Sequence, residues 1–318
     1  MKDWTCLALA LASLGWAQGV TPPPPSGPTT APTQTQVVLL GTGTPPADPD
    51  RSGPATAVVV NGTAYLVDFG AGVVRRAKSA AVDKGIAALN PVDLRVVFAT
   101  HLHSDHTVGY PDLILTPWVI GRRVPLEVYG PSGIKAMTDH LLEAYSADFE
   151  TRTKDRKLYT VGAFPEGHAV NTHEVRAGVV YKDANVTVTA FATKHAMESY
   201  GYRFDTPDRS IVISGDTNPT PATIDACHGC DVLIHEVLTL DWLGRRQDFK
   251  GYAADFHTTT TQLTELATQA KPGLLILYHA SLSIRPSVDS ERSTAAVLLG
   301  EMSRYAGRVV VARDLDVY

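Results

Sequence analysis

The feature that most constrains this chain is a histidine-rich segment, residues 101–106, which directly follows an apolar run over residues 94–99. The run has the length and composition of a fully buried strand. The segment carries three imidazoles and one carboxylate, on His101, His103, His106 and Asp105. These groups together suit zinc, manganese or iron, and a ligand set that leaves one position open for water makes a hydrolytic site. The alternative is a polar surface loop that is rich in histidine by chance.

Three further residues of the same chemistry stand where predicted strands end. His195 follows the strand over residues 186–192, Asp216 follows residues 211–214, and His279 follows residues 274–278. Loops at the ends of buried strands can hold ligands within bonding distance. Taken singly, each of the three is also compatible with a buried polar group satisfied by hydrogen bonds. Together with the first segment they make seven ligands, which suit two metals with one bridging carboxylate and a hydroxide between them.

The first residues are predicted to lie outside the folded domain. Residues 1–17 combine a basic start, an apolar stretch and a small-x-small cleavage signal at Gly15 to Ala17, the features of a secretory signal peptide. The apolar stretch is too short to span a bilayer, and no further transmembrane run follows it. A buried N-terminal helix is the alternative, disfavoured because residues 18–35 form a Pro/Thr-rich linker. We therefore expect a periplasmic or secreted protein whose hydrolase domain covers residues 36–318.

The periodicity of that domain predicts a mixed α/β architecture. Asn61-Gly62 joins two alternating runs and is a strong hairpin signal. The expected strands cover residues 35–40, 56–60, 63–68, 94–99, 126–129, 175–181, 186–192, 201–204, 210–214, 232–237, 274–278 and 308–312, and the expected helices residues 73–88, 107–119, 132–149 and 260–270. A cluster of strands with an antiparallel pattern is followed by a helix and then a strand, and this order occurs twice along the chain. This order suits two packed mixed sheets with helices on the outside.

Composition and short motifs disfavour some classes of binding partner. A formal net charge of −5 and a pI near 6.1 leave no basic excess for a phosphate backbone, so stable nucleic-acid binding is disfavoured. The Gly-rich loop at residues 41–45 ends a strand with no evident helix after it, and fails the dinucleotide and P-loop templates. For Cys227 and Cys230, a disulfide is the preferred interpretation in an exported protein, and two free thiols are the alternative.

The pattern His101-x-His103-x-Asp105-His106, followed by His195, Asp216 and His279, resembles the metallo-beta-lactamase superfamily. Several shorter stretches resemble its ribonuclease Z-like branch: Leu40 to Pro45, Leu66 to Gly70, Gly201 to Phe204, His235-Glu236 and His257 to Thr259. Others resemble the exported arylsulfatase-type members of that branch: Arg75-Arg76, Leu113 to Trp118 and Tyr129 to Gly133. The resemblance begins near Val37 and runs to the C-terminus. It implies a four-layer αββα sandwich.

The resemblance also implies a role for each site residue. Two Zn²⁺ ions are expected, with Mn²⁺ or Fe²⁺ in one site as the alternative. The first would be held by His101, His103 and His195, the second by Asp105, His106 and His279, with Asp216 bridging them. His257 would give a proton to the leaving group and Glu236 would orient it, so that Asp105, His257 and Glu236 count as catalytic residues. Otherwise, His257 would be a helix-start residue and Glu236 a locally paired carboxylate. Asp68 is expected to orient a ligand histidine.

One difference from the tRNA-processing members of this branch bears on the expected substrate. The tRNA-processing relatives carry a long basic arm that grips tRNA, and the segment between His106 and His195 shows no such insertion. Export would also separate the protein from tRNA. We therefore expect a small-molecule ester as substrate, foremost a sulfate ester, with no nucleic acid as partner. Phosphodiester or lactone hydrolysis on the same dimetal centre is the alternative, and a homodimer is allowed. A non-catalytic periplasmic zinc-binding protein would need neither His257 nor a bridging water.

Overall fold

The computed structural model describes residues 35–154, 164, 166–280 and 288–318, and no side chain of residues 288–294. The predicted signal peptide and all but the last residue of the predicted linker lie outside these ranges, so those boundaries stay predictions. Among the described helices, none combines the length and the apolar character that a membrane crossing requires.

The first sheet has six strands in the order of the sequence. These are β1 (Gln36–Gly41), β2 (Ala55–Val60), β3 (Thr63–Val67), β4 (Val96–Phe98), β5 (Leu126–Gly130) and β6 (Val170–Glu174). The first three strands pair antiparallel, and the pairs from β3 to β6 are parallel. The predicted hairpin joins β2 to β3, where Asn61 and Gly62 both have positive φ, as a tight hairpin turn requires.

The second sheet has seven strands in the order β13-β12-β11-β10-β9-β8-β7. These are β7 (Gly178–Lys182), β8 (Thr187–Ala192), β9 (Tyr200–Asp205), β10 (Ser210–Ile213), β11 (Val232–Val237), β12 (Leu274–Ala280) and β13 (Val309–Val311). Pairs from β7 to β10 are antiparallel and those from β10 to β13 are parallel. Each sheet is therefore antiparallel at one side and parallel at the other.

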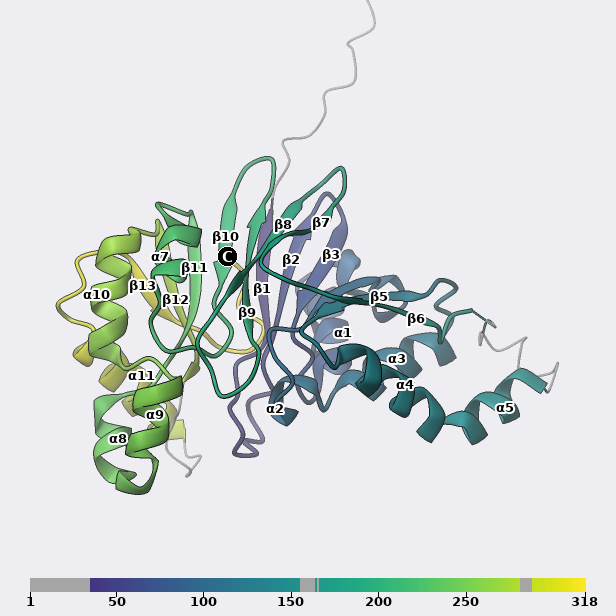
Figure 1. Ribbon diagram of the computed structural model, residues 1–318, viewed down its shortest axis with the longest axis horizontal. Helices are drawn as coiled ribbons and strands as arrows, with labels where there is room; N and C mark the ends of the chain where they lie inside the picture. Colours follow the sequence, from purple (N-terminus) through teal and green to yellow (C-terminus); the bar gives the residue numbers. More distant parts are fainter. Residues whose placement is uncertain (1–34, 155–163, 165, 281–287) are drawn as a thin grey trace, which may run out of the picture. The chain divides into compact units, whose positions relative to one another are not determined.

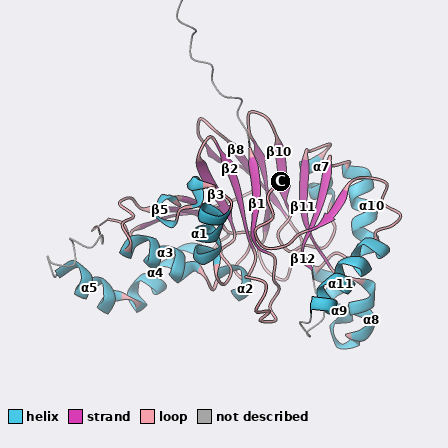
Figure 2. Cartoon of the chain, turned by 180° about the vertical axis from the view of Figure 1, so that it is seen from behind, coloured by secondary structure: helices cyan, strands magenta, loops and turns pink. Residues whose placement is uncertain are grey.

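Three separate apolar cores show that the domain has four layers. One lies between the two sheets, with Phe98, Tyr202 and Ile213 fully buried in it. Another lies between the first sheet and its helices, and the third between the second sheet and its helices. Figures 1 and 2 show helices on the outer side of each group of strands. The predicted αββα sandwich is confirmed.

The helices divide between the two sheets. On the first sheet are α1 (Val73–Asp83), α2 (Ser104–Thr107), α3 (Tyr110–Val119), α4 (Ile134–Ala144) and α5 (Ser146–Lys154). On the second are α7 (Pro221–Cys227), α8 (Leu240–Arg245), α9 (Lys250–Phe256), α10 (Thr260–Ala270) and α11 (Val288–Glu301). Thr259 and Gln262 form a capping box that fixes the start of α10, where the sequence placed it.

Several elements differ from the sequence prediction. The expected helix over residues 132–149 is two helices, α4 and α5, that meet at Tyr145. The edge strand β6 was missed because its residues, Val-Asn-Thr-His-Glu, are mostly polar and exposed. Helices α8 and α9 were missed because they are short and contain Gly244 and Gly251. Cys227 and Cys230 form the predicted disulfide at the end of α7.

Candidate metal centre

The candidate site lies where parallel strands of both sheets end. The segment 101–106 follows β4, Asp216 follows β10, Glu236 lies in β11 and His279 in β12. Carboxyl ends of neighbouring parallel strands share one edge of a sheet, which is where α/β folds place their ligands. His195 reaches the same place from the loop after β8. The seven residues that the sequence singled out as ligands, far apart along the chain, are therefore brought together.

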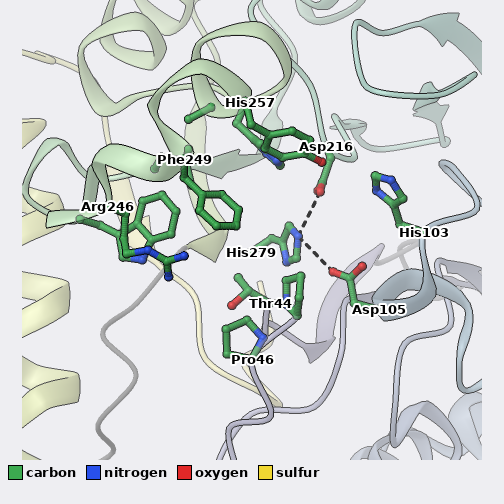
Figure 3. Close-up of a pocket in the computed structure, with 14 residues that line it drawn as sticks. Thr44, Pro46, His103, Asp105, Asp216, Arg246, Phe249, His257 and His279 are labelled. Atoms are coloured by element: carbon green, nitrogen blue, oxygen red, sulfur yellow. Dashed lines mark hydrogen bonds and ion pairs between the residues drawn. The ribbon is translucent and has the colours of Figure 1, made fainter. Parts of the chain in front are cut away.

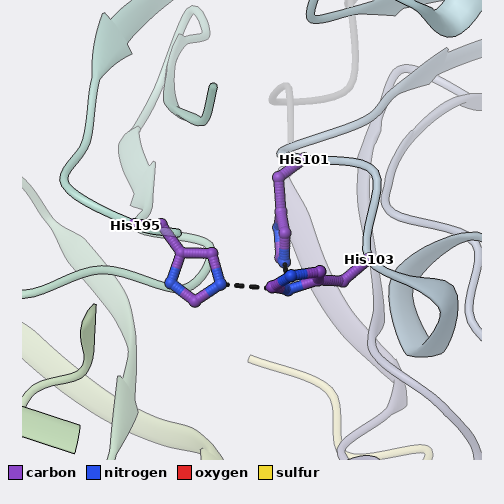
Figure 4. Close-up of side chains that lie close together, drawn as sticks. All are labelled: His101, His103 and His195. Atoms are coloured by element: carbon purple, nitrogen blue, oxygen red, sulfur yellow. Dashed lines mark hydrogen bonds between the residues drawn. The ribbon is translucent and has the colours of Figure 1, made fainter. Parts of the chain in front are cut away.

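Three imidazoles form one cluster, called here the three-histidine cluster (Figure 4). The Nδ1 atom of His103 lies 3.0 Å from the Nε2 atom of His101 and 3.0 Å from the Nε2 atom of His195. Burial lowers the pKa of all three rings, and the neighbouring His106 lowers that of His101 further. Neutral rings keep lone pairs, so these converging nitrogens could bind a metal.

Asp105, His106 and His279 form a second group, called here the mixed cluster. The Nε2 atoms of His106 and His279 lie 3.4 Å apart, and Asp105 Oδ2 lies 3.7 Å from the first and 3.6 Å from the second. Asp216 places Oδ1 3.4 Å from His106 Nε2. Its Oδ2 atom lies 3.2 Å from His279 Nε2 (Figure 3). Asp216 also groups with His101, so it faces both clusters.

A β-bulge aims His279 at the site. In the pairing of β11 with β12, Glu236 lies opposite Tyr278 and Val237 opposite Ala280, which leaves His279 as the extra residue. Its φ of 44° is left-handed, a conformation that costs a non-glycine residue free energy and is common at functional sites. The apolar pattern of β12 predicts a strand here but not the bulge, so this part of the geometry could not be read from the sequence.

Three of the clustered imidazoles are fixed through the other ring nitrogen. His106 Nδ1 lies 2.8 Å from Asp68 Oδ2, His279 Nδ1 lies 2.6 Å from the Gly43 carbonyl oxygen, and His195 Nδ1 lies 3.0 Å from the Phe256 carbonyl oxygen. Such contacts fix the tautomer and the ring orientation of metal-binding histidines. The contact of Asp68 agrees with its predicted orienting role.

Replacing Asp68 with asparagine should weaken metal binding about 10- to 100-fold, the usual loss for such an outer contact. Asp68 Oδ2 accepts hydrogen bonds from His106 Nδ1 and from the Thr100 hydroxyl, and Oδ1 accepts one from the Thr100 amide. An amide group of the same size cannot accept all three. The metal Kd, measured by competition with a chelator, checks this. Asp183→Asn is the matched control, because Asp183 accepts comparable bonds in the turn between β7 and β8.

His257 and Glu236 form a pair beside the clusters. His257 Nδ1 lies 3.1 Å from Glu236 Oε1, which also accepts hydrogen bonds from the Thr217 and Thr258 amides. Burial alone would lower the pKa of His257. The charge of Glu236 and this hydrogen bond outweigh burial and raise the pKa to about 9. The centroid of the His257 ring lies 5.1 Å from that of the His195 ring. The pair therefore favours the protonated form of the His257 imidazole and leaves its Nε2 atom free of Glu236.

The donor set fits a divalent metal. Asp105 Oδ2 and Asp216 Oδ1 are buried oxygens without a hydrogen-bond partner among the described residues. A buried carboxylate oxygen without a partner is costly unless a cation neutralises it. Two ligand atoms bonded to one tetrahedral zinc at about 2.0–2.1 Å lie roughly 3.3 Å apart. The donor spacings of 3.0 Å in the three-histidine cluster and 3.4–3.7 Å in the mixed cluster are close to this value.

A cavity of about 450 Å³ opens onto both clusters. His103, Asp105, Asp216, His257 and His279 line one part of it, and Figure 3 shows Arg246 and Phe249 across from His103 and Asp105. The opposite wall comes from α8, α9 and the turn between them, and consists of Trp242, Arg246, Phe249 and Tyr252. The sequence analysis missed these four residues. The only signal was a concentration of aromatic residues just before His257.

The remaining described histidines lie outside the ligand clusters. His140 is exposed on α4, His173 stacks on Tyr129, and His168 packs against Trp118 and Phe149. His228 ends α7 in a left-handed conformation and His235 is buried in β11. These five histidines are therefore structural or exposed.

The chain is similar to known proteins over most of its length. A family model described as the beta-lactamase superfamily domain matches residues 63–280. The ribonuclease Z of Mycobacterium bovis BCG is 32% identical over 288 residues, which cover 88% of this chain and 96% of that protein. The ribonuclease Z of Mycobacterium sp. (strain KMS) is 35% identical over 272 residues, which cover 82% and 90%.

Solved structures agree on the fold. The short form of human tRNase Z has a TM-score of 0.64 at 21% identity, covering 89% of this chain and 98% of that one. The metallo-beta-lactamase fold protein YhfI from Bacillus subtilis has a TM-score of 0.64 at 19% identity, covering 90% and 99%.

These relatives overturn two expectations. A sulfate ester as substrate and the absence of a nucleic-acid partner are both wrong, because the relatives that are 32% and 35% identical over most of the chain are named ribonuclease Z. The arylsulfatase-type cues misled because they belong to the scaffold. Arg75 pairs with Asp112 on the surface, residues 113–118 lie in α3, and residues 129–133 join β5 to α4. None of these residues is among those that line the cavity.

Net charge and the missing arm are also poor guides to the substrate. The net charge of −5 is a sum over the whole chain, whereas a substrate meets only the charges near the site. The absence of one arm removes one way to grip RNA and leaves the reacting centre unchanged. The ligand clusters, the αββα sandwich and the end-to-end similarity agree with one another. The chain therefore belongs to the metallo-beta-lactamase superfamily of metal-dependent hydrolases, and within it to the ribonuclease Z-like branch.

Proposed function

We propose that this protein is a metal-dependent ribonuclease that hydrolyses phosphodiester bonds in RNA, with tRNA-like transcripts as the first candidate substrates. The observation that carries the proposal is the similarity to ribonuclease Z over 88% of the chain, because the site geometry alone would suit many esters. The cavity supports it, since ligand residues and the His257–Glu236 pair line or adjoin the same space of about 450 Å³.

Two zinc ions are the proposed cofactors. His101, His103 and His195 would hold one, Asp105, His106 and His279 the other, and Asp216 would contact both. Two such metal ions, when bound, polarise phosphoryl oxygens and lower the pKa of bound water toward neutrality. Imidazoles bind metals as neutral rings, so among the proposed ligands only the carboxylates of Asp105 and Asp216 would offset the charge of two divalent ions. The occupied site would keep positive charge for an anionic phosphodiester.

His257 is the proposed proton donor to the departing ribose oxygen. Its Nδ1 is held by Glu236 Oε1, so the proton to be transferred is the one on Nε2. The amides of Thr217 and Thr258 donate to the same Oε1 atom and hold Glu236 in place, which fixes the direction of the imidazole. A donor positioned in this way contributes about 100- to 10,000-fold to the rate when the leaving group is a poor one.

Export is a further part of the proposal. Residues 1–17 have the features of a signal peptide, and the Cys227–Cys230 disulfide suits an oxidising compartment. An exported ribonuclease would meet RNA in the periplasm or outside the cell.

Protein isolated from the exported fraction should contain the disulfide. The unreduced peptide that carries Cys227 and Cys230 should be about 2 Da lighter than its reduced form, because one S–S bond replaces two S–H groups. Peptide mass spectrometry with and without reductant checks this. Two alkylated thiols in the unreduced sample would show that the pair is free.

A panel of substrates tests the proposed activity. Metal-loaded protein is incubated with a tRNA transcript extended at both ends, an unstructured RNA of equal length, and the DNA of the same sequence. The proposal predicts cleavage of RNA that stops when a chelator is added and returns with zinc. Intact RNA after incubation with a protein that contains its full metal complement would contradict it.

A further inference from the structure

The cavity wall opposite the metal ligands has a composition that the hydrolytic chemistry does not need. This wall, called here the aromatic wall, consists of Trp242, Phe249 and Tyr252 together with Arg246. Phe249 has its ring centroid 5.9 Å from that of Trp242 and 6.1 Å from that of Tyr252, each at a steep angle. The guanidinium carbon of Arg246 lies 4.4 Å from the centre of the Phe249 ring, within cation–π range.

The aromatic wall does not serve the core of the fold. Phe249 is 39% exposed and Tyr252 is 37% exposed, although burying such rings would stabilise the protein. Clustered apolar side chains left open beside a cavity mark a binding surface. These rings belong to none of the three apolar cores.

The supporting helices are nevertheless anchored. Glu301 of α11 accepts hydrogen bonds from the Leu240 and Asp241 amides at the start of α8, and from the Thr260 hydroxyl at the start of α10. The Thr239 hydroxyl accepts a hydrogen bond from the Trp242 amide and caps the same end of α8. The wall is therefore held in place before a ligand arrives, which reduces the entropy lost on binding.

Arg246 adds a cation to this wall. Its Nε and Nη2 atoms donate to the two oxygens of Asp248 at 3.1 and 3.0 Å. Its Nη1 atom has no hydrogen-bond partner among the residues that the structure describes. A planar cation held against an aromatic ring, with donors to spare, suits a phosphate group that lies next to a stacked base.

We propose that the aromatic wall is a nucleotide subsite, which stacks one base of the RNA next to the phosphodiester that is cut, with Arg246 contacting a neighbouring phosphate. This inference rests on the proposed ribonuclease activity and names the part of the substrate that the cavity selects. A cavity of about 450 Å³ is within the range that holds small ligands, so the base and the reacting phosphate would share one cavity. Stacking accepts every base, because each has a π face.

Calorimetry with two ligands isolates the contribution of the base. Uridine monophosphate and ribose 5-phosphate both carry a sugar and a phosphate, and only the first carries a base. Zinc-loaded protein should bind the nucleotide about 5- to 150-fold more tightly, the range for one base stacked on aromatic side chains. Phe249→Leu keeps an apolar side chain without a ring and should lose most of this preference, whereas Phe249→Trp should retain it.

A matched control comes from Tyr145, which is also 39% exposed but is not among the cavity residues. Tyr145→Leu should keep the full preference for the nucleotide. Equal binding of both ligands by the unaltered protein, or equal behaviour of Phe249→Leu and Tyr145→Leu, would overturn the subsite. RNA cleavage by the unaltered protein is scored separately. Cleavage without nucleotide preference would refute the subsite alone, and nucleotide preference without cleavage would support the subsite and refute the ribonuclease.

Discussion

Replacing Asp216 with alanine should lower RNA cleavage by roughly 1,000-fold or more and reduce the bound metal. Asp216 contacts the mixed cluster through Oδ1 near His106 and Oδ2 near His279, and it also groups with His101 of the three-histidine cluster. Lewis-acid stabilisation is worth several kcal/mol, and each 1.36 kcal/mol corresponds to a factor of ten in rate. Turnover on an RNA oligonucleotide and metal content by elemental analysis are the two measurements.

Asp225→Ala is the control for this change. Asp225 is an exposed carboxylate on α7, so its removal alters the net charge by the same amount and leaves the metal centre intact. The control should keep full activity and full metal content. An Asp216→Ala protein that is folded, fully loaded with metal and as active as the control would rule out a bridging role.

Replacing His257 with alanine should lower turnover on RNA by about 100- to 10,000-fold, the usual contribution of a general acid. The departing ribose oxygen is a poor leaving group that needs a proton. A nitrophenyl phosphodiester, whose leaving oxygen scarcely needs one, should lose much less. Metal content should stay unchanged, because the seven proposed ligands remain in place. Single-turnover rates on both substrates, together with elemental analysis, check these statements.

His173 provides a closely matched control. Its Nε2 lies 2.8 Å from Glu127 Oε2, so it is also a histidine paired with a glutamate, outside the cavity. His173→Ala should leave turnover on both substrates unchanged. Equal losses on both substrates for His257→Ala would mean that this residue positions the substrate. A loss of metal would mean that it supports the metal centre, where it lies close to His195 and Asp216.

The sequence was most informative where local pattern and chemistry coincide. The hairpin at Asn61-Gly62 was predictable because one local turn demands these residues, and α10 because its cap residues mark its start. The clustering of the histidines and aspartates was predictable because imidazole and carboxylate at strand ends have few other uses in such numbers. The layered fold followed from the order of strands and helices.

Other features depend on contacts between segments far apart in the sequence. The bulge at His279 arises from its pairing with β11, and the orientation of its ring depends on Gly43, which lies 236 residues earlier. The aromatic wall comes from short helices anchored by Glu301, a contact that no local pattern reveals. The substrate was misjudged because total charge and scaffold motifs carry little information about which phosphorus, sulfur or carbon centre reaches the metals.

The chemistry of the RNA ends tests the central claim most directly. Cleavage of a tRNA transcript in ¹⁸O-labelled water by metal-loaded protein should give ends with a phosphate monoester that carries the label, because water is the nucleophile at a metal hydrolase centre. The same experiment after chelation should give no cleavage. Ends that carry a 2′,3′-cyclic phosphate without label, or cleavage that persists in the metal-free protein, would contradict metal-dependent hydrolysis at this site.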